Sequence, residues 1–331
     1  MEIERQQTRV RAPERVERDA TPLPSHEAEL PPPGAQAEGD DVDARDLSAL
    51  RKTLERAAPL FDRLFQPEVH GTAHLMAHGP AFVAGNHSGG TLAMIEPLLL
   101  AHALHRQLAL EDLPELMLHE VMWHTPLAHW IARRGAMRAS RANAEKILAR
   151  GRKVLVYPGG EREAYRSFWN RDHVSFGDHR GYVQLAIEHG VPVIPVVTAG
   201  MHSSFIALTD GHWLAERVPL AERLRVTVLP LTVGFPFGLV PFLPPPYVPW
   251  MGRVHIRVLP PLRFPRTGVE AAADADYVGR CHDTVVSTME RALQDLAQVR
   301  RATRRRDLHA ALDRWIDRAE RWTSRAPKPP V

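Results

Sequence analysis

A histidine stands at the end of a predicted buried strand, in a segment suited to a reaction site. The run Ala81-Phe82-Val83-Ala84 predicts a short strand, and Gly85-Asn86-His87-Ser88-Gly89-Gly90 follows it, just before a helical pattern. Open α/β folds place their sites at the carboxyl edge of the sheet, and a neutral histidine there suits general-base catalysis near pH 7. The glycines allow close approach to a ligand, and N–H groups at a helix start stabilise a developing anion. A plain strand-to-helix turn with a hydrogen-bonded histidine fits the same residues.

A second polar motif also follows a predicted strand. The strand Lys153–Tyr157 leads into Pro158-Gly159-Gly160-Glu161-Arg162-Glu163, with Arg166 shortly after. These residues could equally form a turn and the solvated start of a helix. The two motifs lie about seventy residues apart and each ends a strand of one predicted sheet. Together they favour a shared site at its edge.

Helical and strand patterns alternate along the chain. Helices are expected at 47–65 (where Pro59 could kink the helix), 91–108, 142–149, 181–188 and 276–299, with strands at 81–84, 153–157 and 191–197. Such alternation predicts an α/β fold, a single domain whose mostly parallel mixed sheet is flanked by helices. Residues 1–45 are rich in Arg, Glu, Asp, Ala and Pro and are expected to be disordered. The expected division is therefore 1–45, a catalytic domain at 46–270, and a helical region with a basic tail at 271–331.

The order of the motifs resembles the glycerolipid acyltransferase superfamily, which includes lysophosphatidate acyltransferases. That family has an Asn-His motif, a Pro-Glu-Gly or Pro-Gly-Gly motif, and a Val-Pro-Ile-Val-Pro-Val segment. The matching residues here are Asn86-His87, Pro158-Gly159-Gly160 and Val191-Pro192-Val193-Ile194-Pro195-Val196, and residues 134–140 resemble the family's acceptor-side block. The Pro-Gly-Gly form, with Glu163 after it, looks closer to the diacylglycerol- and wax-type branch. The resemblance covers about residues 50–270.

This resemblance implies an O-acyltransferase that moves a fatty acyl group from a thioester to a lipid hydroxyl. His87 would act as the general base, because a lipid hydroxyl must lose its proton as it attacks. A carboxylate on the other ring nitrogen would fix the tautomer and stabilise the imidazolium. Acyl-CoA or acyl carrier protein would be the co-substrate, with no cofactor. Substrate-binding residues are expected among the motifs: Asn86, Ser88, Gly89, Gly90, Arg138, Ser140, Pro158, Gly159, Gly160, Glu161, Arg162 and Glu163.

The sequence departs from the family at the catalytic acid. The family usually has an acid five residues after the histidine, where this chain has Leu92, and the nearest downstream acid is Glu96. A helix from about Thr91 would bring Glu96 within reach of the imidazole, so Glu96 is the expected catalytic acid. Three alternatives remain open: Glu96 only caps the helix, Glu161 or Glu163 orients His87, or the protein is inactive. No metal-ligand spacing such as His-Glu-x-x-His occurs, so no metal is expected.

Two segments point to a membrane surface. Residues 226–250 contain no charged residue and hold Phe235, Phe237, Phe242 and Trp250 among several prolines, which forbid a regular spanning helix. The second segment is a basic tail whose apolar stripe consists of Leu308, Leu312, Trp315, Ala319 and Trp322. A lipid-facing loop and an interfacial helix would explain both. A buried strand with a rigid connector would account for part of the first segment, and a tail helix packed on the domain explains the second equally.

Composition restricts the partners and the cellular compartment that fit this sequence. The chain has 331 residues, a net charge of +3 and one cysteine, Cys281. These values argue against a nucleic-acid polyelectrolyte and fit a reducing compartment. No signal sequence or apolar spanning segment is evident, so a cytoplasmic protein, peripheral on the inner face of the membrane, is expected. Two other functions stay open: a catalytically lapsed lipid-binding homologue, and a lipid hydrolase that uses the same histidine.

Overall fold

The computed structural model describes residues 39–76, 79–87, 95–203, 206–211, 217, 229–234, 237–241 and 252–323, with side chains in the last range described as far as residue 303. The chain divides into two units, residues 1–36 and 37–331, and all the described residues belong to the second. Ser88, Gly89, Gly90 and Leu92 lie outside the described residues.

Seven strands form a mixed, mostly parallel sheet in the order β1-β10-β6-β2-β5-β3-β4. They are β1 (Glu68–His70), β2 (Ala81–Gly85), β3 (Glu115–Leu118), β4 (Ala136–Arg138), β5 (Lys153–Val156), β6 (Val193–Ala199) and β10 (His255–Val258). Every neighbouring pair is parallel except β10 and β6. The predicted α/β class is thereby confirmed, with β2 and β5, the strands before the two motifs, side by side.

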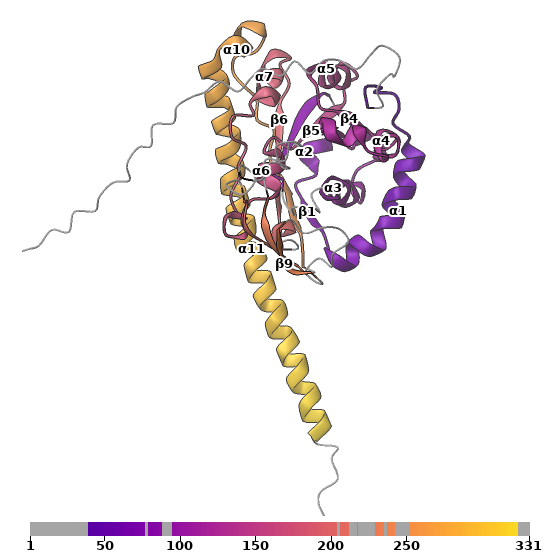
Figure 1. The fold of residues 1–331 in the computed structure, drawn as a ribbon, viewed down its shortest axis with the longest axis vertical. Coiled ribbons are helices and arrows are strands. Elements are labelled where there is room, and N and C mark those ends of the chain that lie inside the picture. Colours follow the sequence, from indigo (N-terminus) through magenta and orange to yellow (C-terminus); the bar gives the residue numbers. More distant parts are fainter. Residues whose placement is uncertain are drawn as a thin grey trace, which may run out of the picture. The chain divides into compact units, whose positions relative to one another are not determined.

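Helices cover both faces of this sheet (Figure 1). The longer ones are α1 (Leu47–Leu64), α3 (Glu96–His105), α5 (Arg141–Ala149), α7 (Gly181–Glu188) and α11 (Ala275–Thr323). The shorter α-helices are α2 (Ala73–Met76), α4 (Ala128–Ala132), α6 (Gly160–Ala164) and α10 (Val269–Ala273). Single 3₁₀ turns occur at η2 (Leu110–Asp112), η3 (Glu120–His124), η4 (Phe168–Asn170) and η5 (Met201–Ser203).

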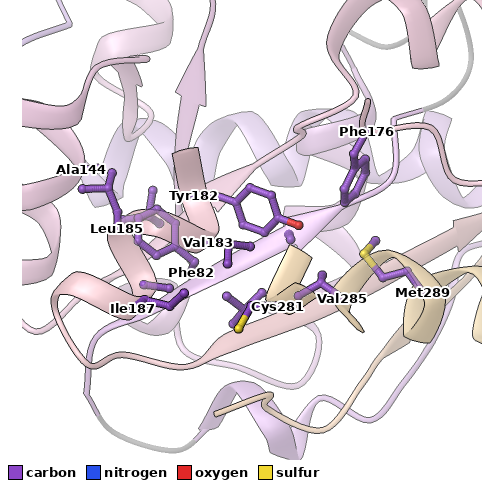
Figure 2. Close-up of a cluster of buried hydrophobic side chains, with 14 of the residues drawn as sticks. Phe82, Ala144, Phe176, Tyr182, Val183, Leu185, Ile187, Cys281, Val285 and Met289 are labelled. Carbon is purple, nitrogen blue, oxygen red and sulfur yellow. The ribbon is translucent and has the colours of Figure 1, made fainter. Parts of the chain in front are cut away.

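The core has two halves, because successive residues of a strand point to opposite faces of the sheet. Phe82 and Ala84 of β2 pack with α5, α7, α10 and α11 on one face. Figure 2 shows part of this cluster, which joins Phe82 with Tyr182 and Ile187 of α7 and with Cys281 and Met289 of α11. Ala81 and Val83 pack with α1, α3 and η2 on the other face. Burial on both faces explains why the strands are apolar throughout rather than alternating.

The described part of the uncharged segment contains strands. The strands β7 (Ile206–Thr209), β8 (Leu231–Gly234) and β9 (Gly238–Pro241) form an antiparallel sheet in the order β7-β8-β9. Phe237 and Leu239 are exposed on it. Phe235, Phe242 and Trp250 lie outside the described residues, so the predicted lipid-facing loop stays a prediction.

The packed chain begins earlier than residue 45, which corrects the expected extent of disorder at residues 39–45. Val42 is buried, the Gly39 carbonyl accepts a hydrogen bond from the Arg138 N–H at 2.8 Å, and Arg152 donates to the Val42 carbonyl. Asp40 accepts a hydrogen bond from the buried Asn143 of α5 at 2.7 Å. Composition missed this segment because distant partners, rather than its own apolar residues, hold it.

The helix expected at 276–299 and the tail helix expected after it form one continuous helix. The predicted helix at 276–299 is the first part of α11, which continues to Thr323. Side chains of this first part, including Val285 and Leu293, are fully buried against β6 and α7, so it belongs to the core of the domain. The side chains of the tail stripe from Leu308 onward lie outside the described residues. Among the helices of the described chain, none combines the length and the hydropathy that crossing a bilayer requires.

Candidate active site

The imidazole of His87 contacts the carboxylate of Glu96. His87 comes two residues after the end of β2, at the carboxyl edge of the sheet, and Glu96 is the first residue of α3. Nδ1 of His87 and Oε2 of Glu96 are 2.8 Å apart. The Glu96 side chain is 2% exposed and that of His87 is 18% exposed. Because the carboxylate occupies Nδ1, it favours the tautomer whose Nε2 lone pair is free to accept a proton.

Local sequence explains why Glu96 starts a helix. Pro97 follows it, and proline is well tolerated in the first turn, where its missing N–H costs nothing. A carboxylate in the first turn is also stabilised by the helix dipole. The structure therefore brings His87 and Glu96 together as the sequence predicted, whereas their catalytic roles stay predictions.

A second glutamate holds the backbone of His87. Oε2 of Glu163 accepts a hydrogen bond from the His87 N–H at 2.7 Å, and Oε1 accepts one from the Ser175 N–H at 3.0 Å. Arg166 lies 3.2 Å from Oε1 of Glu163 and donates to the His87 carbonyl at 2.9 Å. This ion pair therefore fixes both main-chain groups of His87.

The Glu163–Arg166 pair is buried, which affects both groups. Burial raises the pKa of Glu163, and the Arg166 guanidinium and the two backbone N–H groups oppose that shift. Burial likewise lowers the pKa of Arg166, and Glu163 opposes this. A carboxylate that accepts two N–H bonds and faces a guanidinium is favoured in its ionised form. The structure thus places Glu163 behind His87, with its carboxylate engaged by protein groups rather than open to a substrate.

The Pro-Gly-Gly turn makes room for this carboxylate. A Cβ on Gly159 would come 2.3 Å from Oε2 of Glu163, so only glycine fits there. Gly160 has φ of +53°, a conformation that glycine adopts at little cost. Pro158 is half-buried in the turn, and Glu161 and Arg162 are exposed on α6.

The other predicted substrate-binding residues are engaged elsewhere. The buried Asn86 side chain forms two hydrogen bonds with the backbone of Thr198, which ties β2 to β6. Ser140 caps α5 by accepting from the Asn143 N–H at 3.2 Å. Arg138 pairs with Asp40 and Glu120. Its strand β4 lies three strands from β2, roughly 14 Å at ordinary strand spacing. The structure does not bring Arg138 or Ser140 to His87.

Two side chains at this edge were not singled out from the sequence. The Tyr157 ring lies against the His87 imidazole, with centroids 4.7 Å apart. Burial and then the charge of Glu96 hold the pKa of Tyr157 well above its usual value, so the phenol stays protonated. His202 of η5 is 3% exposed, and neither ring nitrogen has a hydrogen-bond partner among the described residues. Burial lowers its pKa well below the usual value, with further contributions from Arg166, His87 and Arg171.

An apolar cavity of about 330 Å³ extends from beside Glu96. Ile95 and Pro97, which flank Glu96, line it, and so do side chains from α1, β3, α4 and β5. Leu127 and Trp130 of the same lining are exposed, so the cavity opens to solvent near them. Apolar walls beside a polar site suit a ligand that carries an apolar chain.

A second cavity of about 340 Å³ lies on the side of Arg166. Its lining is mostly polar and consists of Arg162, Arg166, Ser167, Asn170, His173, Val174, Ser175 and Asp210. Arg166, which donates to the His87 carbonyl, thus lines the polar cavity, and the two residues that flank Glu96 line the apolar one.

One group of metal-ligand types occurs in the described part of the chain, far from His87 in the sequence. Glu145, Glu188 and His189 bring ligand atoms within 4.8 Å of one another. Arg141 already pairs with both carboxylates, and all of these side chains are at least partly exposed. This group therefore has the character of a surface ion-pair network.

A histidine–carboxylate pair thus lies at the carboxyl edge of an α/β sheet, next in sequence to residues that line an apolar cavity. Residues 66–199 match the family model described as Acyltransferase. The predicted resemblance to acyltransferases is thereby confirmed for residues 66–199, which make up less than half of the chain.

Individual relatives share part of the chain. An uncharacterized protein of Mycobacterium tuberculosis is 27% identical over 182 residues, which cover 55% of this chain and 50% of that protein. The mouse "DGAT1/2-independent enzyme synthesizing storage lipids" is 34% identical over 116 residues, 34% of each chain. The match thus spans about half the length of the mycobacterial relatives and a third of the mouse enzyme. The solved 1-acyl-sn-glycerophosphate (LPA) acyltransferase PlsC from Thermotoga maritima has a TM-score of 0.44 at 20% identity, covering 76% of this chain and 79% of that one.

Proposed function

We propose that this protein transfers a fatty acyl group from a thioester to a hydroxyl group of a glycerolipid or related lipid, with His87 as the general base. The observation that carries the proposal is the 2.8 Å contact between Nδ1 of His87 and Glu96, at a sheet edge that borders an apolar cavity. The contact with Glu96 uses Nδ1, which leaves Nε2 to accept the proton of an acceptor hydroxyl.

The reaction uses these groups in a simple order. Nε2 of His87 takes the proton of the acceptor hydroxyl as its oxygen attacks the thioester carbon. Glu96 stabilises the imidazolium that forms. The C–S bond then breaks, and the leaving thiolate takes the proton back from His87. The products are the new ester and a free thiol.

We assign the acyl chain to the apolar cavity. Ile95 and Pro97 connect its wall to the residue that binds His87, so a chain held there has its thioester near the imidazole. Removing a long acyl chain from water contributes about 0.8 kcal/mol per buried CH₂. The donor is acyl-CoA or acyl carrier protein, and the polar cavity is available to the head of a lipid acceptor.

Thiol release in the presence of a panel of lipid acceptors tests this function. The expected result is release of thiol that depends on an added acceptor, with the ester product identified by mass spectrometry. A lipid hydrolase would instead release free fatty acid without an acceptor. A lapsed lipid-binding homologue would release no thiol, and either result would overturn the proposal.

We further propose that the protein works on the cytoplasmic face of a membrane without spanning it. The basic tail and the uncharged segment at 226–250 motivate this location. Attraction to an anionic surface is about 1 kcal/mol per basic residue and is screened by salt, whereas apolar insertion is not. High salt should therefore release only part of the protein from anionic liposomes. Full-length protein that does not float with such liposomes at low salt would refute the location.

A further inference from the structure

The ring of Tyr157 covers one face of the catalytic imidazole. Tyr157 directly follows β5, and its neighbour Val156 pairs with Ala84 of β2. The ends of these two strands are therefore side by side, with Tyr157 facing the turn that carries His87. The two ring centroids are 4.7 Å apart and the ring planes differ by 31°, a tilted stack whose centroid distance lies within the favourable range.

The residue before the Asn-His motif makes this stack possible. A Cβ on Gly85 would come 2.7 Å from Cε1 of Tyr157, closer than carbon atoms approach without displacement. Gly85 has no positive φ, so its backbone does not demand glycine. Glycine is required at this position because the tyrosine ring occupies the space of a side chain.

The imidazole is thus held on two sides. Glu96 contacts its Nδ1 edge at 2.8 Å, and Tyr157 lies against its face. A cation over an aromatic face within about 6 Å is attracted by the ring quadrupole, most strongly when water is excluded. The attraction is stronger for the protonated imidazole than for the neutral one, because the ring carries a positive charge only after His87 takes a proton. The phenol itself stays protonated, since burial and Glu96 raise the pKa of Tyr157.

We propose that Tyr157 is a positioning residue for acyl transfer, whose ring fixes the plane of the His87 imidazole and stabilises the imidazolium formed during the reaction. This inference rests on the proposed function. The hydroxyl proton moves to Nε2 of His87 while the new C–O bond forms, so a positive charge develops beneath the ring. It disappears when the thiolate leaves and takes that proton. An interaction confined to the charged state accelerates the reaction without tightening substrate binding.

Two substitutions of Tyr157 distinguish the role of its aromatic ring from the role of its hydroxyl group. Tyr157→Leu removes the aromatic face and should lower kcat about 10-fold, with KM changed by less than about threefold. Tyr157→Phe keeps the face and should retain at least half of the wild-type kcat. Melting temperatures of both variants identify any loss that follows from unfolding. A Phe variant as slow as the Leu variant would overturn the role of the ring and assign the effect to the hydroxyl.

Gly85→Ala displaces the ring from the opposite strand and gives an independent test. Alone, this substitution should lower kcat to a similar extent, because the new Cβ forces the Tyr157 ring away from the imidazole. In the background of Tyr157→Leu, the same change should cost much less, since the clash is gone. Strictly additive losses would contradict the stack as the shared cause.

The stack itself is measurable without turnover. Ring protons of His87, assigned by their loss in His87→Gln, should show ring-current shifts in the ligand-free protein that persist in Tyr157→Phe and disappear in Tyr157→Leu. Wild-type kcat in Tyr157→Leu would refute the inference while leaving the proposed function intact. Wild-type protein that transfers no acyl group would refute the proposed function and this inference with it.

Discussion

Two glutamates contact His87, and they hold different parts of the residue. Glu96 comes from α3 and meets the imidazole, whereas Glu163 comes from α6 and binds the backbone N–H. Glu96 is flanked by two residues that line an apolar cavity, and its carboxylate contacts a group that gains a charge in the proposed reaction. Glu163 is fully buried among a guanidinium and two backbone N–H groups. Glu96 therefore interacts with any charge that develops on the His87 imidazole, whereas Glu163 fixes the position of the His87 backbone. The comparison separates the chemistry of the histidine from its placement.

Removing the imidazole should have the largest effect on kcat, and the effects of the two glutamate substitutions are compared with it. His87→Ala should lower kcat by about 10³-fold or more, because a positioned general base contributes roughly 10²–10⁴-fold. The melting temperature should change little, since the side chain is partly exposed and makes one side-chain hydrogen bond in the described structure. Steady-state thiol release and thermal unfolding measure the two quantities. Activity above about a tenth of wild type would exclude His87 as the base.

Glu96→Gln should come next in its effect on rate. The amide keeps the shape of the side chain but not the charge that stabilises the imidazolium, so kcat should fall about 10²-fold with KM nearly unchanged. Glu111→Gln, an exposed glutamate in η2, is the matched control and should behave as wild type. Full activity in Glu96→Gln beside an inactive Glu163→Gln would transfer the acid role to Glu163.

Glu163→Gln should have the opposite balance of effects and lower the stability of the protein more than its rate. It leaves Arg166 as a buried charge without its partner, which costs about 3–5 kcal/mol. The melting temperature should fall by about 10 °C in a domain of this size. At a temperature where the variant is folded, kcat should fall by about 10-fold or less. Glu161→Gln, exposed on the same helix, is the control. An unchanged melting temperature would contradict the structural role of the pair.

The smallest effect should come from His202, which is buried at the same edge without a partner in the described structure. Its pKa is lowered well below 6.5 in the folded chain, whereas the unfolded chain takes up a proton near 6.5. Stability from this group is therefore present above pH 6.5 and is lost as the pH falls. Between pH 7.5 and 5.5, wild type should lose about 1.4 kcal/mol more unfolding free energy than His202→Gln. Denaturant titrations at the two pH values measure the difference, and equal losses would contradict the lowered pKa.

Periodicity and motif order predicted much of the architecture. The strands at 81–84 and 153–157 and the helices at 47–65, 142–149 and 181–188 agree with β2, β5, α1, α5 and α7 to within one residue at each end. The strand expected at 191–197 is β6, which lies two residues later. These elements are apolar runs or amphipathic stripes, so their own side chains specify them. The order of residues 39–45 was missed because packing partners far along the chain decide it.

The sequence by itself determined the α/β class, the acyltransferase resemblance and the two turns that border the site, because periodicity and strand-end glycines are local properties. It left open which acid serves His87, since Glu96, Glu161 and Glu163 are all plausible by spacing. Only the tertiary structure shows which part of His87 each glutamate contacts. The start of α3 directs Glu96 to the imidazole, and the pairing of β2 with β5 brings Glu163 to the backbone N–H of His87. It also showed that Gly85 is needed for the Tyr157 ring rather than for a turn. Contacts between residues 70 or more positions apart depend on strand order and helix orientation, which no local pattern encodes.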